Sequence, residues 1–227
     1  MRTLARGFTL IEIAIVLVII GLLLGGVIKG EELIRAARVR SLISEEQGIK
    51  AAFYGFQDRF RALPGDYAGA SSNINCGATA CVNGDGNGRI EPGNAAGMHE
   101  EIMLWTHLTA AGFLNGSFTA AAADTAPTDA NNPKNPYSVY VQLVYDNNYG
   151  TGTTPSRHNF KTGGHIPVEL VAEVDRKVDD GNPYTGSFQF SPYAPPGAVA
   201  PNAATCVSGT NWNIAGDDSN CAGASLF

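Results

Sequence analysis

Two short stretches of this 227-residue chain carry side chains suited to binding a metal ion. The first runs from Asn83 to Glu91, where oxygen-bearing side chains alternate with glycine as in the first half of an EF-hand-type calcium loop. The twelfth position of that pattern is Asn94 rather than the bidentate Glu that sets affinity. Glu91, Glu100 or Glu101 would have to supply the missing carboxylate. The sequence leaves open both a calcium site and a Gly- and Asn-rich turn without metal. The candidate calcium ligands are Asn83, Asp85, Asn87, Arg89 (through its carbonyl) and Glu91.

The second stretch places Asp175, Asp179 and Asp180 at the end of a predicted helix. Acids in the last turn oppose the helix dipole, and Asp175 and Asp179 repel each other because they lie four residues apart on one face. Neighbouring basic side chains, loop N–H groups folded back at the Gly181 turn, or a bound cation could offset this repulsion. Of these interpretations we favour the hydrogen-bonded turn.

No group of residues in the sequence matches a catalytic motif. The four histidines are scattered, and none accompanies a Ser or Cys nucleophile motif. His99 is followed by Glu100 and Glu101, but the second histidine of the H-E-x-x-H zinc-protease motif is missing. We therefore predict a non-enzymatic protein that requires no cofactor, and calcium is the one ion that the sequence leaves open.

The four cysteines predict two disulfide bonds. Their number is even, and they lack the paired C-x-x-C spacing of a zinc site. Of the three pairings that four cysteines allow, we favour Cys76–Cys81 and Cys206–Cys221, because short loops close at the least entropic cost. Disulfide bonds place this part of the chain in an oxidising compartment outside the cytoplasm.

Charge is distributed unevenly along the chain. Residues 1–61 contain nine Lys or Arg and six Asp or Glu, a net charge of +3. The total of −6 therefore leaves residues 62–227 with a net charge of −9. An acidic region of this kind repels phosphate backbones, so we predict no direct binding of nucleic acid.

The elements that must position these residues begin with an apolar segment. Between Phe8 and Ile28 the only charged residue is Glu12, and a run of this length suits a helix that crosses about 30 Å of hydrocarbon. Arg2 and Arg6 precede the run, which keeps the N-terminus in the cytoplasm and exports the rest of the chain. No small-residue cleavage site follows the run, so we expect the segment to be retained.

The string from Gly7 to Glu12, Gly-Phe-Thr-Leu-Ile-Glu, resembles the prepilin signature of the type IV pilin and pseudopilin superfamily. The resemblance implies that a prepilin peptidase cuts between Gly7 and Phe8 and methylates the new amine of Phe8. Glu12 then becomes the fifth residue of the mature subunit. A carboxylate in hydrocarbon needs a partner, so we expect Glu12 to pair with the Phe8 amine of a neighbouring subunit during assembly.

On this resemblance the chain is a structural subunit, major or minor, of a type IV pilus-like filament. Its implied partners are identical or related pilin subunits, the prepilin peptidase, membrane lipid, and the inner-membrane assembly platform with its cytoplasmic ATPase. The precursor would span the bacterial inner membrane once, with a periplasmic head, and the product would be an extracellular or periplasmic filament. Two alternatives remain: a type II secretion pseudopilin, and a singly anchored periplasmic binding module that never polymerises.

Beyond the apolar run the pattern becomes amphipathic and then loop-rich. A stripe of apolar residues from Leu42 to Leu63 predicts one buried helix face, and Pro64-Gly65 ends the helix. In the remainder we expect helices over residues 95–113 and 167–180 and strands over residues 137–145, 157–166 and 186–190.

These elements predict an α+β fold, in which a long N-terminal helical stem packs on a small antiparallel β-sheet head, the architecture that the resemblance also implies. The stem has a membrane half and an amphipathic half. We divide the chain into a cleaved leader (residues 1–7), a transmembrane or filament-core helix (8–30), the amphipathic half of the stem (31–63) and a disulfide-containing acidic head (64–227).

Overall fold

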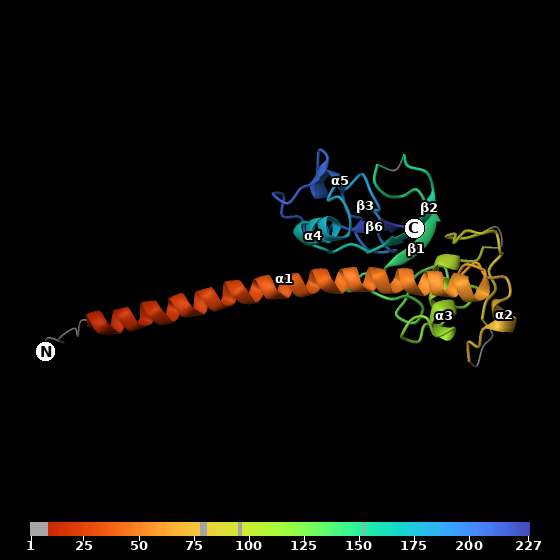
Figure 1. Cartoon of the computed structure of the whole chain (residues 1–227), viewed down its shortest axis with the longest axis horizontal. Helices are drawn as coiled ribbons and strands as arrows, with labels where there is room; N and C mark the ends of the chain where they lie inside the picture. The colour runs from red at the N-terminus through yellow and green to blue at the C-terminus, as the bar shows by residue number, and fades with distance from the viewer. Residues whose placement is uncertain (1–8, 78–80, 95–96, 152) are drawn as a thin grey trace. The chain divides into compact units, whose positions relative to one another are not determined.

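The computed structural model of the chain describes residues 9–77, 81–94, 97–151 and 153–227. The chain divides into two compact units, Met1–Arg38 and Val39–Phe227. Helix α1, Leu10–Phe60, contributes residues to both units (Figure 1). It ends where Arg61 adopts a left-handed backbone conformation with φ of 53°, three residues before Pro64.

The second unit contains a four-stranded antiparallel sheet with the order β1-β2-β6-β3. Strand β1 (Gln142–Asp146) pairs with β2 (Arg157–Lys161), and β6 (Gly223–Leu226) lies between β2 and β3 (Phe188–Phe190). The last strand of the chain therefore completes the middle of the sheet. A separate two-stranded sheet is formed by β4 (Val207–Ser208) and β5 (Asn211–Trp212).

The described residues of the second unit form four further helices. They are α2 (Ala70–Asn73), α3 (Glu100–Ala110), α4 (Val168–Val178) and α5 (Ala203–Cys206). In Figure 1, α3 lies on one side of the C-terminal part of α1, and the sheet and α4 lie on the other.

Apolar side chains of α1 take part in two core clusters. Val39 and Leu42 pack with residues of α4 and β3. Ile49, Phe53 and Phe56 pack with residues of α3, β1 and β2. The C-terminal part of α1 is thus buried along one face, as its apolar stripe predicts.

The observed fold confirms the predicted α+β class, a long N-terminal helix with an antiparallel sheet, but several boundaries differ. The strand expected over residues 137–145 begins only at Gln142. Before that point the side chain of Asn135 accepts hydrogen bonds from the N–H groups of Tyr137 (2.9 Å) and Val139 (3.0 Å), so these groups are not free to form a ladder. The expected helix over residues 95–113 is shorter, Glu100–Ala110.

Both favoured disulfide bonds are present in the structure, Cys76–Cys81 and Cys206–Cys221. Cys206 and Cys221 are fully buried, and their bond joins the end of α5 to the segment that enters β6. The covalent link therefore fixes the approach of the chain to its central strand.

Candidate functional site

The predicted processing and assembly residues lie at the start of the chain. Gly7 and Phe8 lie outside the described residues. Glu12 lies in the first turn of α1. Its Oε2 accepts hydrogen bonds from the backbone N–H of Thr9 (2.7 Å) and from the Thr9 hydroxyl (2.8 Å), and its own N–H donates to that hydroxyl at 3.3 Å.

This arrangement is a capping box, in which Thr9 and Glu12 satisfy N–H groups that the first helical turn leaves without partners. Thr9 directly follows Phe8 in the sequence, so the carboxylate is bound to the residue next to the predicted cleavage product's first residue. Sequence reasoning missed the role of Thr9, although the spacing Thr-x-x-Glu ahead of an apolar run signals it.

The segment between Glu12 and Lys29 exposes an apolar surface that no charged residue interrupts. Every large apolar side chain between Leu10 and Ile34 is exposed, from 46% at Ile20 to 92% at Leu10. Among the described residues, α1 is the one helix long and apolar enough to cross a membrane. An apolar surface of this size must be covered by lipid or by other proteins.

In the loop predicted to bind calcium, some of the candidate ligands contact one another, whereas Asn83 is bonded elsewhere. The Asn87 side-chain amide donates to Asp85 (3.2 Å) and to Glu91 (3.0 Å), and Arg89 lies 3.9 Å from Glu91. The side-chain oxygen of Asn83, in contrast, accepts the N–H of Ser71 at 2.7 Å.

A different carboxylate set surrounds this loop. Oxygen atoms of Asp66, Asp85 and Glu100 lie within 4.8 Å of one another. Glu100 on α3 is fully buried and accepts hydrogen bonds from the N–H of Asp85 (3.1 Å), the N–H of Glu91 (3.2 Å) and the side chain of Asn94 (3.0 Å). These residues could hold a cation with oxygen ligands.

The electrostatics of the set reflect its burial. Burial raises the pKa of Glu100 to about 7, and it also raises the pKa of Asp66, which is 3% exposed. Asp66 lies outside the candidate loop in the sequence. It accepts the N–H groups of Asn87 (2.9 Å) and Gly88 (2.8 Å) and so fixes the backbone of the loop. The sequence named Glu100 as a substitute ligand, but it gave no signal for Asp66, which is 17 residues before the candidate loop begins.

A buried histidine connects the segments that carry these acids. His107 of α3 accepts the N–H of Gly65 at Nδ1 (2.9 Å), and its Nε2 lies 2.8 Å from the carbonyl oxygen of Val82. One ring nitrogen accepts while the other donates, which requires the neutral ring. Burial lowers the pKa of His107 to about 4. This residue therefore positions the turn beside Asp66 and the start of the candidate loop.

The second predicted acidic site is a turn in which protein donors satisfy every carboxylate. Asp175, fully buried, accepts Trp212 Nε1 (2.6 Å) and the N–H of Gly181 (3.2 Å), and burial raises its pKa to about 6. Asp179 accepts the N–H of Phe188 at 3.0 Å, and Asp180 accepts the N–H of the residue two positions later at 2.9 Å. Loop N–H groups thus supply the compensation that we favoured for this turn.

The sheet contains a buried lysine side chain. Lys161 of β2 is 1% exposed and pairs with Asp146 of β1, which is 25% exposed. Asp146 also accepts the side-chain amide of Asn159 at 2.9 Å. The pair joins neighbouring strands on one face of the sheet.

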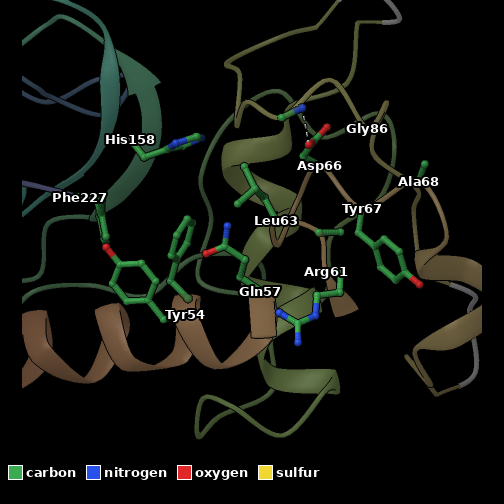
Figure 2. Close-up of a pocket in the computed structure, with 13 residues that line it drawn as sticks. Tyr54, Gln57, Arg61, Leu63, Asp66, Tyr67, Ala68, Gly86, His158 and Phe227 are labelled. Carbon is green, nitrogen blue, oxygen red and sulfur yellow. Dashed lines mark hydrogen bonds between the residues drawn. The ribbon is translucent and has the colours of Figure 1, made fainter. Parts of the chain in front are cut away.

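A cavity of about 590 Å³ lies at the C-terminal end of α1. In Figure 2, Tyr54 and Gln57 reach toward it from α1, and His158 points toward it from β2. Arg61, the residue after α1, also lines it. Phe227 packs on Tyr54 at a ring distance of 6.0 Å. The described lining combines aromatic faces with a few polar groups and brings together no nucleophile and base.

Comparison with known proteins assigns only the N-terminal segment. The family model of the prokaryotic N-terminal methylation motif matches residues 2–28. No curated protein and no solved structure matches the chain. The match covers the predicted cleavage site, the Thr9–Glu12 capping box and the exposed apolar surface as far as Ile28.

Proposed function

From the N-terminal methylation motif, which marks the type IV pilin and pseudopilin superfamily, we propose that this chain is a structural subunit of a type IV pilus-like filament. A prepilin peptidase cuts between Gly7 and Phe8 and methylates Phe8. The processed subunits then polymerise through their N-terminal helices. The function is mechanical, with no turnover of a substrate.

The observation that carries the proposal is the combination of the motif with the surface of α1. A surface that is apolar from Ile13 to Ile28 is stable in lipid, and it is also stable among identical helices. Glu12 is the charged residue at the N-terminal end of this surface. During assembly its carboxylate could release the Thr9 N–H and bind the Phe8 amine of a neighbouring subunit instead.

The proposal places the precursor in the bacterial inner membrane with its disulfide-containing head in the periplasm. Its partners are then related pilin subunits, lipid, the peptidase, and an assembly platform with its ATPase. The acidic head, with a net charge of −9 over residues 62–227, supports a partner other than nucleic acid.

The deciding experiment is the intact mass and N-terminal sequence of the protein in filaments sheared from cells. We expect a chain that begins at N-methylated Phe8 and lacks residues 1–7. Glu12→Ala should abolish filaments while leaving membrane insertion and cleavage intact. The matched control is Glu31→Ala, which removes an exposed acid of the same helix and should leave filaments unchanged.

Two rival functions predict other outcomes. A type II secretion pseudopilin would be cleaved at Gly7 but would appear in filaments only in a periplasmic secretion system. A singly anchored binding module would retain Met1 and would be absent from filaments. Wild-type numbers of filaments from Glu12→Ala would contradict the assembly role of this carboxylate.

We carry calcium binding forward as a second proposal, with Asp66, Asp85 and Glu100 as its ligands. The specific observation in its favour is that two of these three carboxylates are buried while their oxygen atoms lie within 4.8 Å. Among the described residues, no basic side chain pairs with Asp66 or Glu100. A calcium ion would neutralise this charge and is commonly bound by carboxylate and carbonyl oxygens.

A further inference from the structure

We propose that a groove beside Glu45 on α1 receives Arg40 from a second copy of this chain. The proposal rests on the proposed filament function and deepens it, because it names one contact between neighbouring stems. It concerns only residues of the unit Val39–Phe227.

The groove has a volume of about 470 Å³ and runs between α1 and the segment that follows α3. Ser41, Ser44 and Gly48 form its α1 side with Glu45, and Leu114 and Phe118 contribute to the other side. Ser41, Ser44 and Gly48 are exposed, and a Cβ atom placed on Gly48 would meet nothing within 4 Å. Small side chains here allow another chain to approach closely.

Glu45 is a carboxylate without compensation in the single subunit. It is partly buried in the groove, and the structure gives it no hydrogen bond or ion pair with any described residue. Burial raises its pKa to about 7. The adjacent Glu46, in contrast, accepts the hydroxyl of Ser225 (2.5 Å) and pairs with Lys50 (3.1 Å). A cation from outside the subunit would stabilise the ionised form of the Glu45 carboxylate.

The same helix carries a matching cation on another face. Arg40 is exposed and has no hydrogen bond or ion pair among the described residues. It lies five residues before Glu45, which corresponds to a rotation of about 140° around the helix and about 7.5 Å along its axis. The two side chains therefore point in different directions and do not meet within one copy.

A cation on one face and its acceptor on another generate an open-ended assembly. Each copy can place Arg40 in the groove of one neighbour and accept the Arg40 of another. A heterologous contact of this kind builds helical filaments when its rotation does not close a ring. A pair of copies would satisfy only one of the two sites, so the contact favours further addition.

The first test is a charge swap in the full chain. Glu45→Arg and Arg40→Glu should each lower the yield of sheared filaments about tenfold, because each places like charges in contact. The double variant should restore the yield to within about twofold of wild type, since it reverses the pair and keeps it. The control is Asp58→Arg, an exposed acid of α1 outside the groove, which should assemble normally. Membrane level and intact disulfide bonds report folding of each variant.

The second test is cross-linking in membranes and in filaments. A chain with Arg40→Cys and Glu45→Cys should form disulfide-linked oligomers on oxidation, whereas each single variant should remain largely monomeric. The native cysteines are paired within each chain, so they do not compete.

The outcomes separate this proposal from the filament function. Filaments from wild type, with neither rescue by the double variant nor cross-linked oligomers, would overturn the Arg40–Glu45 contact and leave the filament function standing. Cross-linked oligomers in membranes of cells that make no filaments would support the contact and count against the filament function. Loss of filaments in Glu45→Arg alone, with Arg40→Glu normal, would assign the groove to another occupant and overturn the proposal.

Discussion

Acidification should destabilise the second unit, and the buried His107 should account for part of that loss. His107 accepts the N–H of Gly65 and donates to the carbonyl oxygen of Val82, and it can make both bonds only as a neutral ring. Replacing it with a residue that does not titrate should therefore remove part of the pH dependence of unfolding. The variant that we choose is His107→Gln, which keeps a polar side chain of similar length.

The magnitude follows from the difference between the two pKa values. Burial lowers the pKa of His107 from 6.5 to about 4 in the folded chain. Its contribution to stability is therefore complete above pH 6.5 and is lost as the pH falls toward 4, where the folded state must also take up the proton. Between pH 7 and pH 5 these values correspond to a loss of about 2 kcal/mol in the free energy of unfolding.

The assay is urea unfolding of the full chain in detergent, with a chelator present, at pH 7 and at pH 5. Carboxylates whose pKa is raised by burial titrate in both proteins, so their effect cancels when the variant is compared with wild type. At pH 7 the variant should be less stable by about 1–3 kcal/mol, because the Gly65 N–H loses a well-placed acceptor. Its further loss at pH 5 should be smaller than that of wild type by about 2 kcal/mol.

A matched control separates this effect from the general loss of a histidine. His165 is exposed and has a left-handed backbone with φ of 62°, a conformation that Asn tolerates. His165→Asn should keep the pH dependence of wild type. The same pH dependence in His107→Gln and wild type would refute the assignment of this loss to His107.

Two further predictions concern buried charges. In a calorimetric calcium titration of the full chain, Glu100→Gln should weaken calcium binding at least about tenfold. The control variant Asp180→Asn should bind calcium as wild type does. Equal affinity in Glu100→Gln and wild type would exclude Glu100 as a ligand. Asp146→Ala should destabilise the fold by about 3–5 kcal/mol, because it leaves Lys161 buried without its partner. Lys161→Met should cost less, since Asp146 is partly exposed and keeps its bond from Asn159; the reverse order in urea unfolding would contradict this account.

Local patterns were sufficient to predict the helix and the disulfide bonds. The apolar stripe and the absence of proline between Phe8 and Leu63 predict a single long helix, because each signal acts within a few turns. The two bridges close short loops, so chain entropy alone favours their pairing. The methylation motif is equally local, which explains why it could be identified from sequence.

The parts that sequence did not predict depend on contacts between distant residues. Strand β6 is four residues long and lies between β2 and β3, so its pairing is decided by strands that precede it by tens of residues. Asp66 joins the candidate calcium set through contacts between distant segments: the turn after α1 is bonded to His107, and Asp66 itself accepts the N–H groups of Asn87 and Gly88. The predicted domain boundaries after residues 7, 30 and 63 stay predictions.

The carboxylates of the second unit differ in how their charge is compensated. Asp175 has Trp212, and Glu46 has Lys50 and a hydroxyl. Glu100 has neutral donors but no cation, and Glu45 has neither. Burial of a carboxylate without a compensating charge is unfavourable. Glu100 and Glu45 are therefore the positions where binding of an external cation would stabilise the protein most. For Glu100 the proposed cation is an ion held with Asp66 and Asp85, whose oxygen atoms lie within 4.8 Å, whereas for Glu45 it is an arginine that enters the open groove from another subunit.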